Sequence, residues 1–151
     1  ANMLTIDSIT QTQLEGMDAD NPIDNSENSA IQQTPLPSDE QSILDKCSGE
    51  VMLFRLRGPL SFGAAKGITE RMMLIRNYKV LILDITDVPR VGVTASLAIE
   101  DMVQEAKLNS RKAYVAGANG AVRDRLSKFG VNVIGSRKDA LEAASNDINQ
   151  S

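Results

Sequence analysis

The sequence predicts a single α/β domain built on a mainly parallel sheet. From about residue 43 onward, strand-like apolar runs alternate with helix-like segments, and glycine or proline marks several of their ends. The strongest apolar run has no polar alternation, which is typical of parallel strands covered by helices on both faces. With right-handed crossovers, the alternation predicts about four to six strands packed by about four helices.

The first strand and helix of this alternation begin at Val51. Residues Val51 to Leu56 are strand-like, and Gly58-Pro59 breaks the strand. Ser61 is a candidate cap for a helix that runs to about Arg76. The helix should bury one apolar face made of Phe62, Ala65, Ile68, Met72 and Ile75.

The next strand should be the centre of the sheet. Residues Lys79 to Ile85 include the most continuous apolar run of the chain. After a turn at Val88-Pro89, residues Thr94 to Leu108 are expected to form a helix. Its inward face would consist of Ala95, Ile99, Met102, Val103 and Ala106.

Two further strands and two further helices follow. Ala113 to Ala116 is strand-like, and a helix from about Asn119 to Phe129 should end at Gly130 in the left-handed region. Val131 to Ile134 is a short last strand. Ser136 to Asp139 matches a loose capping box and opens a final helix through Ala140, Leu141 and Ala144.

The upstream third of the chain differs in composition from this domain. Residues 16–42 are rich in acidic, polar and proline residues, so they predict a linker or loop. Residues 1–15 include Met3 to Leu14, a strand-like segment that could pair at a sheet edge or against a second copy. The predicted organisation is completed by a folded domain at 43–146 and a tail at 147–151.

Composition argues against most catalytic chemistries. The chain has no histidine, which removes the commonest general base and the commonest metal ligand. Cys47 is the only cysteine, so no intramolecular disulfide can form, and its turn context favours an incidental thiol over an activated thiolate. We therefore expect no enzymatic activity, no cofactor and no catalytic or metal-binding residues.

Charge and hydropathy limit the classes of binding partner that the chain can be expected to have. Residues 1–45 carry nine acidic side chains and no lysine or arginine, whereas the rest of the chain has a net charge of +5. Five aromatic residues and no dense basic patch argue against nucleic acid. No apolar stretch approaches the roughly 20 residues that span a bilayer, so we expect a soluble chain without direct bilayer insertion.

Two loops could carry a function. The loop Gly117 to Gly120 opens a helix and has amides that could hold an anion, but a tight strand-to-helix turn is the favoured interpretation. No dinucleotide or Walker phosphate loop is present. Asp84 and Asp87 end the central strand, where open α/β sheets place functional groups, although turn formation explains them equally well.

Two segments resemble a known family. Val80 to Met102 resembles the central signature of STAS domains, in which an apolar strand ends in aspartate and a loop of the Asp-Ser-Ser/Thr-Gly type opens the next helix. Phe54 to Ala65 is similar to a stretch that SulP transporters carry at this point. Within that family, the lead-in from Leu36 to Gln41 is most similar to cyanobacterial sodium-dependent bicarbonate transporters. The resemblance covers about residues 43–145 and implies the STAS, or anti-sigma factor antagonist-like, fold.

The resemblance also implies a regulatory loop made of Asp84, Asp87, Gly92 and Thr94. Anti-sigma factor antagonists share the fold, and their phosphorylated serine falls at Thr94. The antagonists' aspartate falls at Gly92 and their glycine at Ala95, so the kinase-recognised pattern is altered here. Helix capping by Thr94 is favoured over a phosphorylation switch.

The implied role is that of a cytoplasmic, non-catalytic regulatory and dimerisation domain of a SulP-type anion transporter. Its partners would be a second copy and the transmembrane domain of the same transporter, on the cytoplasmic side of the plasma membrane. The transported ion would be bicarbonate, taken up with sodium, or sulfate. Alternatives are a free-standing anti-sigma factor antagonist and a small nucleotide-binding module.

Overall fold

A parallel four-stranded sheet forms the centre of the molecule. The computed structural model describes residues 35–57, 60, 62–88 and 91–150. Within them the strand order is β1-β2-β3-β4, and every neighbouring pair is parallel. The strands are β1 (Val51–Arg57), β2 (Val80–Asp87), β3 (Lys112–Ala116) and β4 (Val133–Ile134). The predicted parallel α/β fold is confirmed, and β2 lies inside the sheet as expected.

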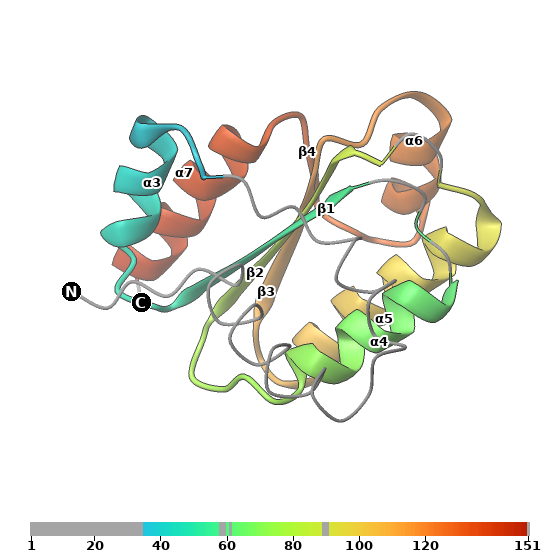
Figure 1. Cartoon of the computed structure of the whole chain (residues 1–151), viewed down its shortest axis with the longest axis horizontal. Coiled ribbons are helices and arrows are strands. Elements are labelled where there is room, and N and C mark those ends of the chain that lie inside the picture. Colours follow the sequence, from blue (N-terminus) through green and yellow to red (C-terminus); the bar gives the residue numbers. More distant parts are fainter. Residues whose placement is uncertain (1–34, 58–59, 61, 89–90, 151) are drawn as a thin grey trace.

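Five helices of the described chain cover the two faces of the sheet. Each crossover steps to the next strand in the same direction, so right-handed connections place their helices on one face. These helices are α4 (Phe62–Met72), α5 (Val93–Leu108) and α6 (Gly120–Lys128). The opposite face is covered by α3 (Ser38–Asp45) and α7 (Arg137–Asn149), which lie side by side (Figure 1).

The core lies where the helices meet the two most apolar strands. Every residue of β2 from Val80 to Ile85 is buried, because helices cover both sides of the strand. The predicted inward face of α5 is buried throughout, which confirms the helical spacing. Ile68, Met72 and Ile75 are buried as predicted, whereas the side chains of Phe62 and Ala65 lie outside the description.

The predicted linker at 16–42 is wrong at its end, because α3 begins at Ser38. This helix was missed because it is short and polar, with a single fully buried apolar residue, Leu44. Asp39 and Glu40 in its first turn are the start signal, since carboxylates there stabilise the helix dipole. The described residues therefore contain one helix more than predicted.

Three other boundaries differ from the predictions. Helix α4 ends at Met72 rather than about Arg76, because the chain turns through Asn77, whose φ is 74°, to enter β2. Strand β4 pairs over two residues only, since the amide of Val131 instead bonds the carbonyl of Leu126. Residues 147–149 of the predicted tail belong to α7.

Several predictions are supported at the helix ends. Gly130 has a φ of +81° after α6, and the Ser136 hydroxyl accepts the Asp139 amide at 3.1 Å, as in the predicted capping box. The Ser61 cap and the strand-like segment Met3 to Leu14 fall outside the described residues.

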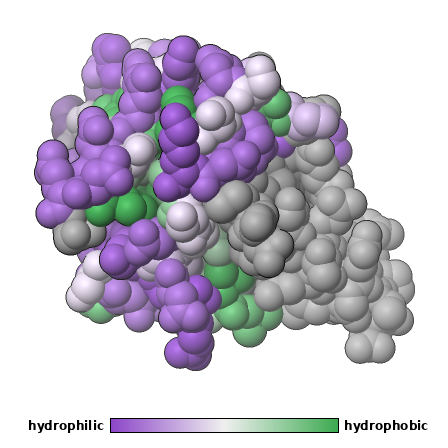
Figure 2. All heavy atoms as spheres, turned by 90° about the vertical axis from the view of Figure 1, so that its left-hand side faces the viewer, coloured by the Kyte–Doolittle hydropathy of each residue, from purple (hydrophilic) through white to green (hydrophobic). Residues whose placement is uncertain are grey.

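The outer surface of the α3 and α7 layer is mostly hydrophilic, with small apolar patches (Figure 2). Exposed large apolar side chains of the described chain include Val93, Leu97 and Leu108, all on α5. None of the helices described combines the length and the apolar character needed to cross a membrane. The two helical layers thus present different surfaces.

Candidate functional site

A buried ion-pair cluster joins three elements at the face of the sheet that α3 and α7 cover. Arg137, the first residue of α7, donates from Nε and Nη2 to the two carboxylate oxygens of Glu40 in α3, the second bond being 3.3 Å long. Its Nη1 donates to Oδ2 of Asp84 in β2 at 2.9 Å. One guanidinium therefore connects α3, α7 and β2.

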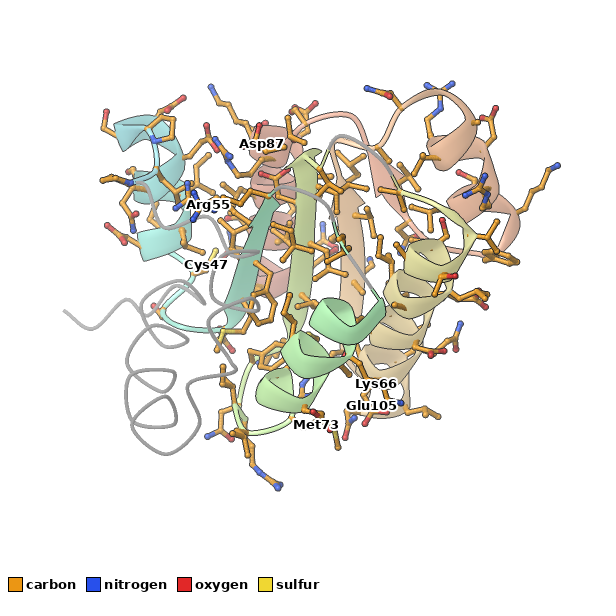
Figure 3. All side chains as sticks on the ribbon, turned by 45° about the vertical axis from the view of Figure 1, so that its right-hand side comes forward. Cys47, Arg55, Lys66, Met73, Asp87 and Glu105 are labelled. Carbon is orange, nitrogen blue, oxygen red and sulfur yellow. The ribbon has the colours of Figure 1, made fainter. Side chains whose placement is uncertain are left out.

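Asp84 is the innermost group of the cluster, with 2% of its surface exposed. Its other oxygen accepts the backbone N–H of Thr86 at 3.0 Å and the Thr86 hydroxyl at 2.5 Å. Arg55, exposed by 4%, is the register partner of Asp84 on β1, so both side chains leave the same face of the sheet. One buried cation, Arg55, one partly buried cation, Arg137, and two buried carboxylates thus belong to one region. Figure 3 shows Arg55 on the side of the sheet that faces α3.

The electrostatics favour the charged state of Arg137. Hydrogen bonding to Glu40 raises the pKa of Arg137, opposed by partial burial and reinforced by Asp84. Buried charges are tolerated only when they are paired and hydrogen-bonded. At the rim, Lys138 and Asp39 form a second α7–α3 pair at 3.1 Å, about half exposed on each side. That pair should contribute little, because solvent screens it.

Sequence reasoning identified Asp84 but not its partners. Glu40 lies 97 residues from Arg137, so no local pattern joins them. The usable signal was Asp84 itself, since an aspartate in a continuously apolar strand needs a buried cation. The sequence places Arg55 and Arg137 near the ends of neighbouring elements, where such a cation would be found.

The structure does not gather the four predicted loop residues at one point. Asp84 faces α7, whereas Gly92 and Thr94 begin α5 on the opposite face of the sheet. Asp87 is exposed at the end of the strand (Figure 3), and its register partner on β1 is Arg57. A regulatory role for this loop remains a prediction.

The predicted cap at Thr94 is wrong. Helix α5 begins at Val93 with Gly92 as the N-cap, so Thr94 lies inside the first turn with an exposed side chain. No side-chain hydrogen bond caps this end. Glycine takes the cap position because it is tolerated there, although it offers no side-chain acceptor.

Thr94→Ala should therefore leave the free energy of unfolding within about 0.5 kcal/mol of the wild type, as for an ordinary surface change. Urea unfolding measures the difference, and Ser136→Ala is the matched control, because Ser136 does cap α7. The control should lose about 1 kcal/mol. A loss at Thr94 as large as that at Ser136 would restore the capping role.

The other two candidate groups are structural. In the loop from Gly117 to Gly120 both glycines have positive φ, +85° and +57°, which supports the turn interpretation. Cys47 is buried, its thiol lies 3.4 Å from the Ile43 carbonyl, and burial raises its pKa. The thiol is therefore protonated at neutral pH, in agreement with an unactivated cysteine.

The arrangement suits mechanical coupling between α3, α7 and β2. In the described part of the chain, no group of three or more histidine, cysteine, aspartate or glutamate side chains could hold a metal. The strand order also advances in one direction, without the reversal that creates a ligand crevice in doubly wound sheets. The cluster instead joins α3 to the sheet.

Comparison with known proteins defines the class. Residues 42–144 match the STAS domain family, so the chain belongs to that family. It is 36% identical over 155 aligned positions to the bicarbonate transporter BicA of Synechocystis sp., covering 95% of this chain and 26% of that protein. It is 38% identical to BicA of Picosynechococcus sp., covering 85% of this chain and 22% of that protein. The chain thus spans about a quarter of the length of these relatives.

Solved structures agree with this assignment. The STAS domain of a SulP transporter from Vibrio cholerae has a TM-score of 0.60 and 27% identity, covering 84% of this chain and 100% of that one. A sulfate transporter family protein from Wolinella succinogenes has a TM-score of 0.57 and 19% identity, covering 82% and 98%. The second likeness shows the fold alone. The predicted resemblance to SulP STAS domains is confirmed.

Proposed function

We propose that this chain is the cytoplasmic, non-catalytic regulatory and dimerisation domain of a SulP-type transporter that takes up bicarbonate with sodium. The observation that carries the proposal is the identity of 36% to BicA over 95% of the chain. The matched part is about a quarter of BicA, so transport itself would belong to a membrane domain of the same protein. Sulfate is the alternative transported ion that the resemblance to SulP transporters implies.

The transport proposal can be tested on the full-length protein that contains this chain. Cells that produce it should accumulate labelled bicarbonate in sodium medium and lose most of that uptake when potassium replaces sodium. Removal of residues 35–150 should lower uptake at equal membrane abundance, since the domain is proposed to support the transporter. Uptake of sulfate alone, or uptake indifferent to the deletion, would contradict the proposal.

The dimerisation proposal draws support from an exposed stripe on α5 that carries apolar side chains at both of its ends. Val93, Leu97 and Leu108 are exposed by 65%, 46% and 80%, and their spacing places them on one side of the helix, where Asp101 and Gln104 lie between Leu97 and Leu108. Apolar surface of this kind is characteristic of contact sites, and a two-fold contact between identical stripes is the simplest closed assembly. A second copy is the proposed occupant.

Sedimentation of the chain at several concentrations should show a monomer–dimer equilibrium. Leu97→Glu should raise the dissociation constant at least about tenfold, because it places a charge opposite its own copy. Phe129→Glu is the control, since Phe129 is exposed by 40% but lies at the end of α6. An unchanged equilibrium in Leu97→Glu would exclude the stripe as the dimer contact. A strictly monomeric chain would exclude self-association.

A further inference from the structure

Arg137 holds Glu40 in the way that a guanidinium holds a free planar anion. Nε and Nη2 donate to the two oxygens of one carboxylate, which is the side-on bidentate geometry. Bicarbonate, formate and acetate present two oxygens in the same planar arrangement. The carboxylate of Glu40 thus stands where such an anion would bind.

The surroundings of Glu40 favour an anion at this position. Among the described residues Arg137 forms ion pairs with Glu40 and Asp84, so without Glu40 it would keep the single carboxylate of Asp84. Asp84 already accepts three hydrogen bonds, one from Arg137 and two from Thr86, and contacts Nη1 rather than the Nε and Nη2 edge. The edge that Glu40 uses would therefore have no carboxylate facing it from β2.

The site can be reached from solvent and Glu40 can leave it. The side chains of Arg137 and Glu40 retain exposures of 22% and 11%. Helix α3 has only 8 residues, and Pro37 at its N-cap provides no side-chain hydrogen bond. So short a helix depends on its tertiary contacts. The exposed pair between Asp39 and Lys138 adds little to holding the first turn. The fully buried apolar anchor of the helix, Leu44, is at the opposite end and exposed by 1%.

We infer that Glu40 occupies an anion-binding site for which a small planar oxyanion of the bicarbonate class competes. When the anion takes the Nε and Nη2 edge of Arg137, the first turn of α3 detaches while Leu44 keeps its second half in place. The position of the segment that precedes β1 would thereby depend on the concentration of the anion. This site is a property of the isolated domain, whichever ion a transporter containing it moves.

The test is a titration of the purified chain with bicarbonate, in which NMR follows the resonance of the Arg137 Nε–H group. Sodium bicarbonate replaces sodium chloride at a constant ionic strength of about 0.15 M, so that screening does not change. Glu40→Ala empties the site. In this variant the Arg137 resonance should report a dissociation constant for bicarbonate at least about tenfold lower than in the wild type, where the tethered carboxylate competes. Glu40→Gln is the second variant if the alanine variant does not fold.

Controls separate this site from general anion effects. Asp39→Ala removes a carboxylate from the same helix, but its partner is the exposed Lys138, so affinity should match the wild type. Formate should bind like bicarbonate, because both are planar. Sulfate is tetrahedral and should bind at least about tenfold more weakly. Amides of residues 39–42 should exchange hydrogen faster in saturating bicarbonate, while those of α7 stay protected.

Two results would overturn the inference. One is an Arg137 resonance in both Glu40 variants that responds no differently to bicarbonate and chloride. The other is bicarbonate binding without faster exchange in α3, which would exclude release of the helix. Either result leaves sodium-dependent uptake by the full-length protein untouched, because that is measured without reference to Arg137.

Discussion

Arg137→Met should lower the free energy of unfolding by about 3 kcal/mol, because it leaves buried carboxylates without their shared cation. Arg137 bonds both Glu40 and Asp84, whose side chains are exposed by only 11% and 3%. Methionine retains much of the length and apolar packing of arginine, so the loss should come mainly from the missing charge. Urea unfolding of purified protein measures the difference.

Two further variants identify the cause of that loss. Lys138→Met removes the neighbouring cation, whose pair with Asp39 is about half exposed, and should cost under about 1 kcal/mol. Adding Glu40→Gln to Arg137→Met should recover part of the stability, because one fewer carboxylate is left unpaired. Equal losses for Arg137→Met and Lys138→Met would show that burial of the cluster contributes nothing.

The fold was predictable from the sequence where burial was strong. Strand β2 is buried on consecutive positions, so its apolar run was visible, and α5 was predicted to within one residue at its start. Helix α3 was not predictable in this way, because it contacts the core through one fully buried residue and has a polar sequence. Its place depends on α7, which lies at the other end of the chain.

The candidate site was less predictable than the fold. Asp84 was selected for its position at a strand end, but the ion pair that explains it needs Glu40 and Arg137 to meet across the folded chain. Thr94 was assigned a cap from residue preference alone, whereas the backbone places Gly92 at that position. The preferences of side chains for the N-cap position differ by about 1 kcal/mol. They are readily overridden by the position at which the backbone leaves a loop and begins a helix.

Gly117 links the loop after β3 to the same cluster. Its φ of +85° lies in the left-handed region, and a Cβ there would stand 2.2 Å from the Thr86 hydroxyl and 2.8 Å from the Thr86 backbone N and Cα. The hydroxyl could rotate, but the backbone atoms cannot yield without moving β2. Thr86 donates two hydrogen bonds to Asp84, so any shift also disturbs the buried carboxylate.

Gly117→Ala should therefore cost about 3 kcal/mol or more, combining left-handed strain with a backbone clash. Gly120→Ala is the matched control, because Gly120 also has a positive φ, +57°, but nothing lies within 4 Å of the added Cβ. Strain alone should cost the control about 1 kcal/mol. Urea unfolding of the two variants side by side isolates the clash as their difference. Equal costs would mean that β2 yields freely at Thr86 and that the close approach of the loop after β3 to β2 does not constrain the cluster.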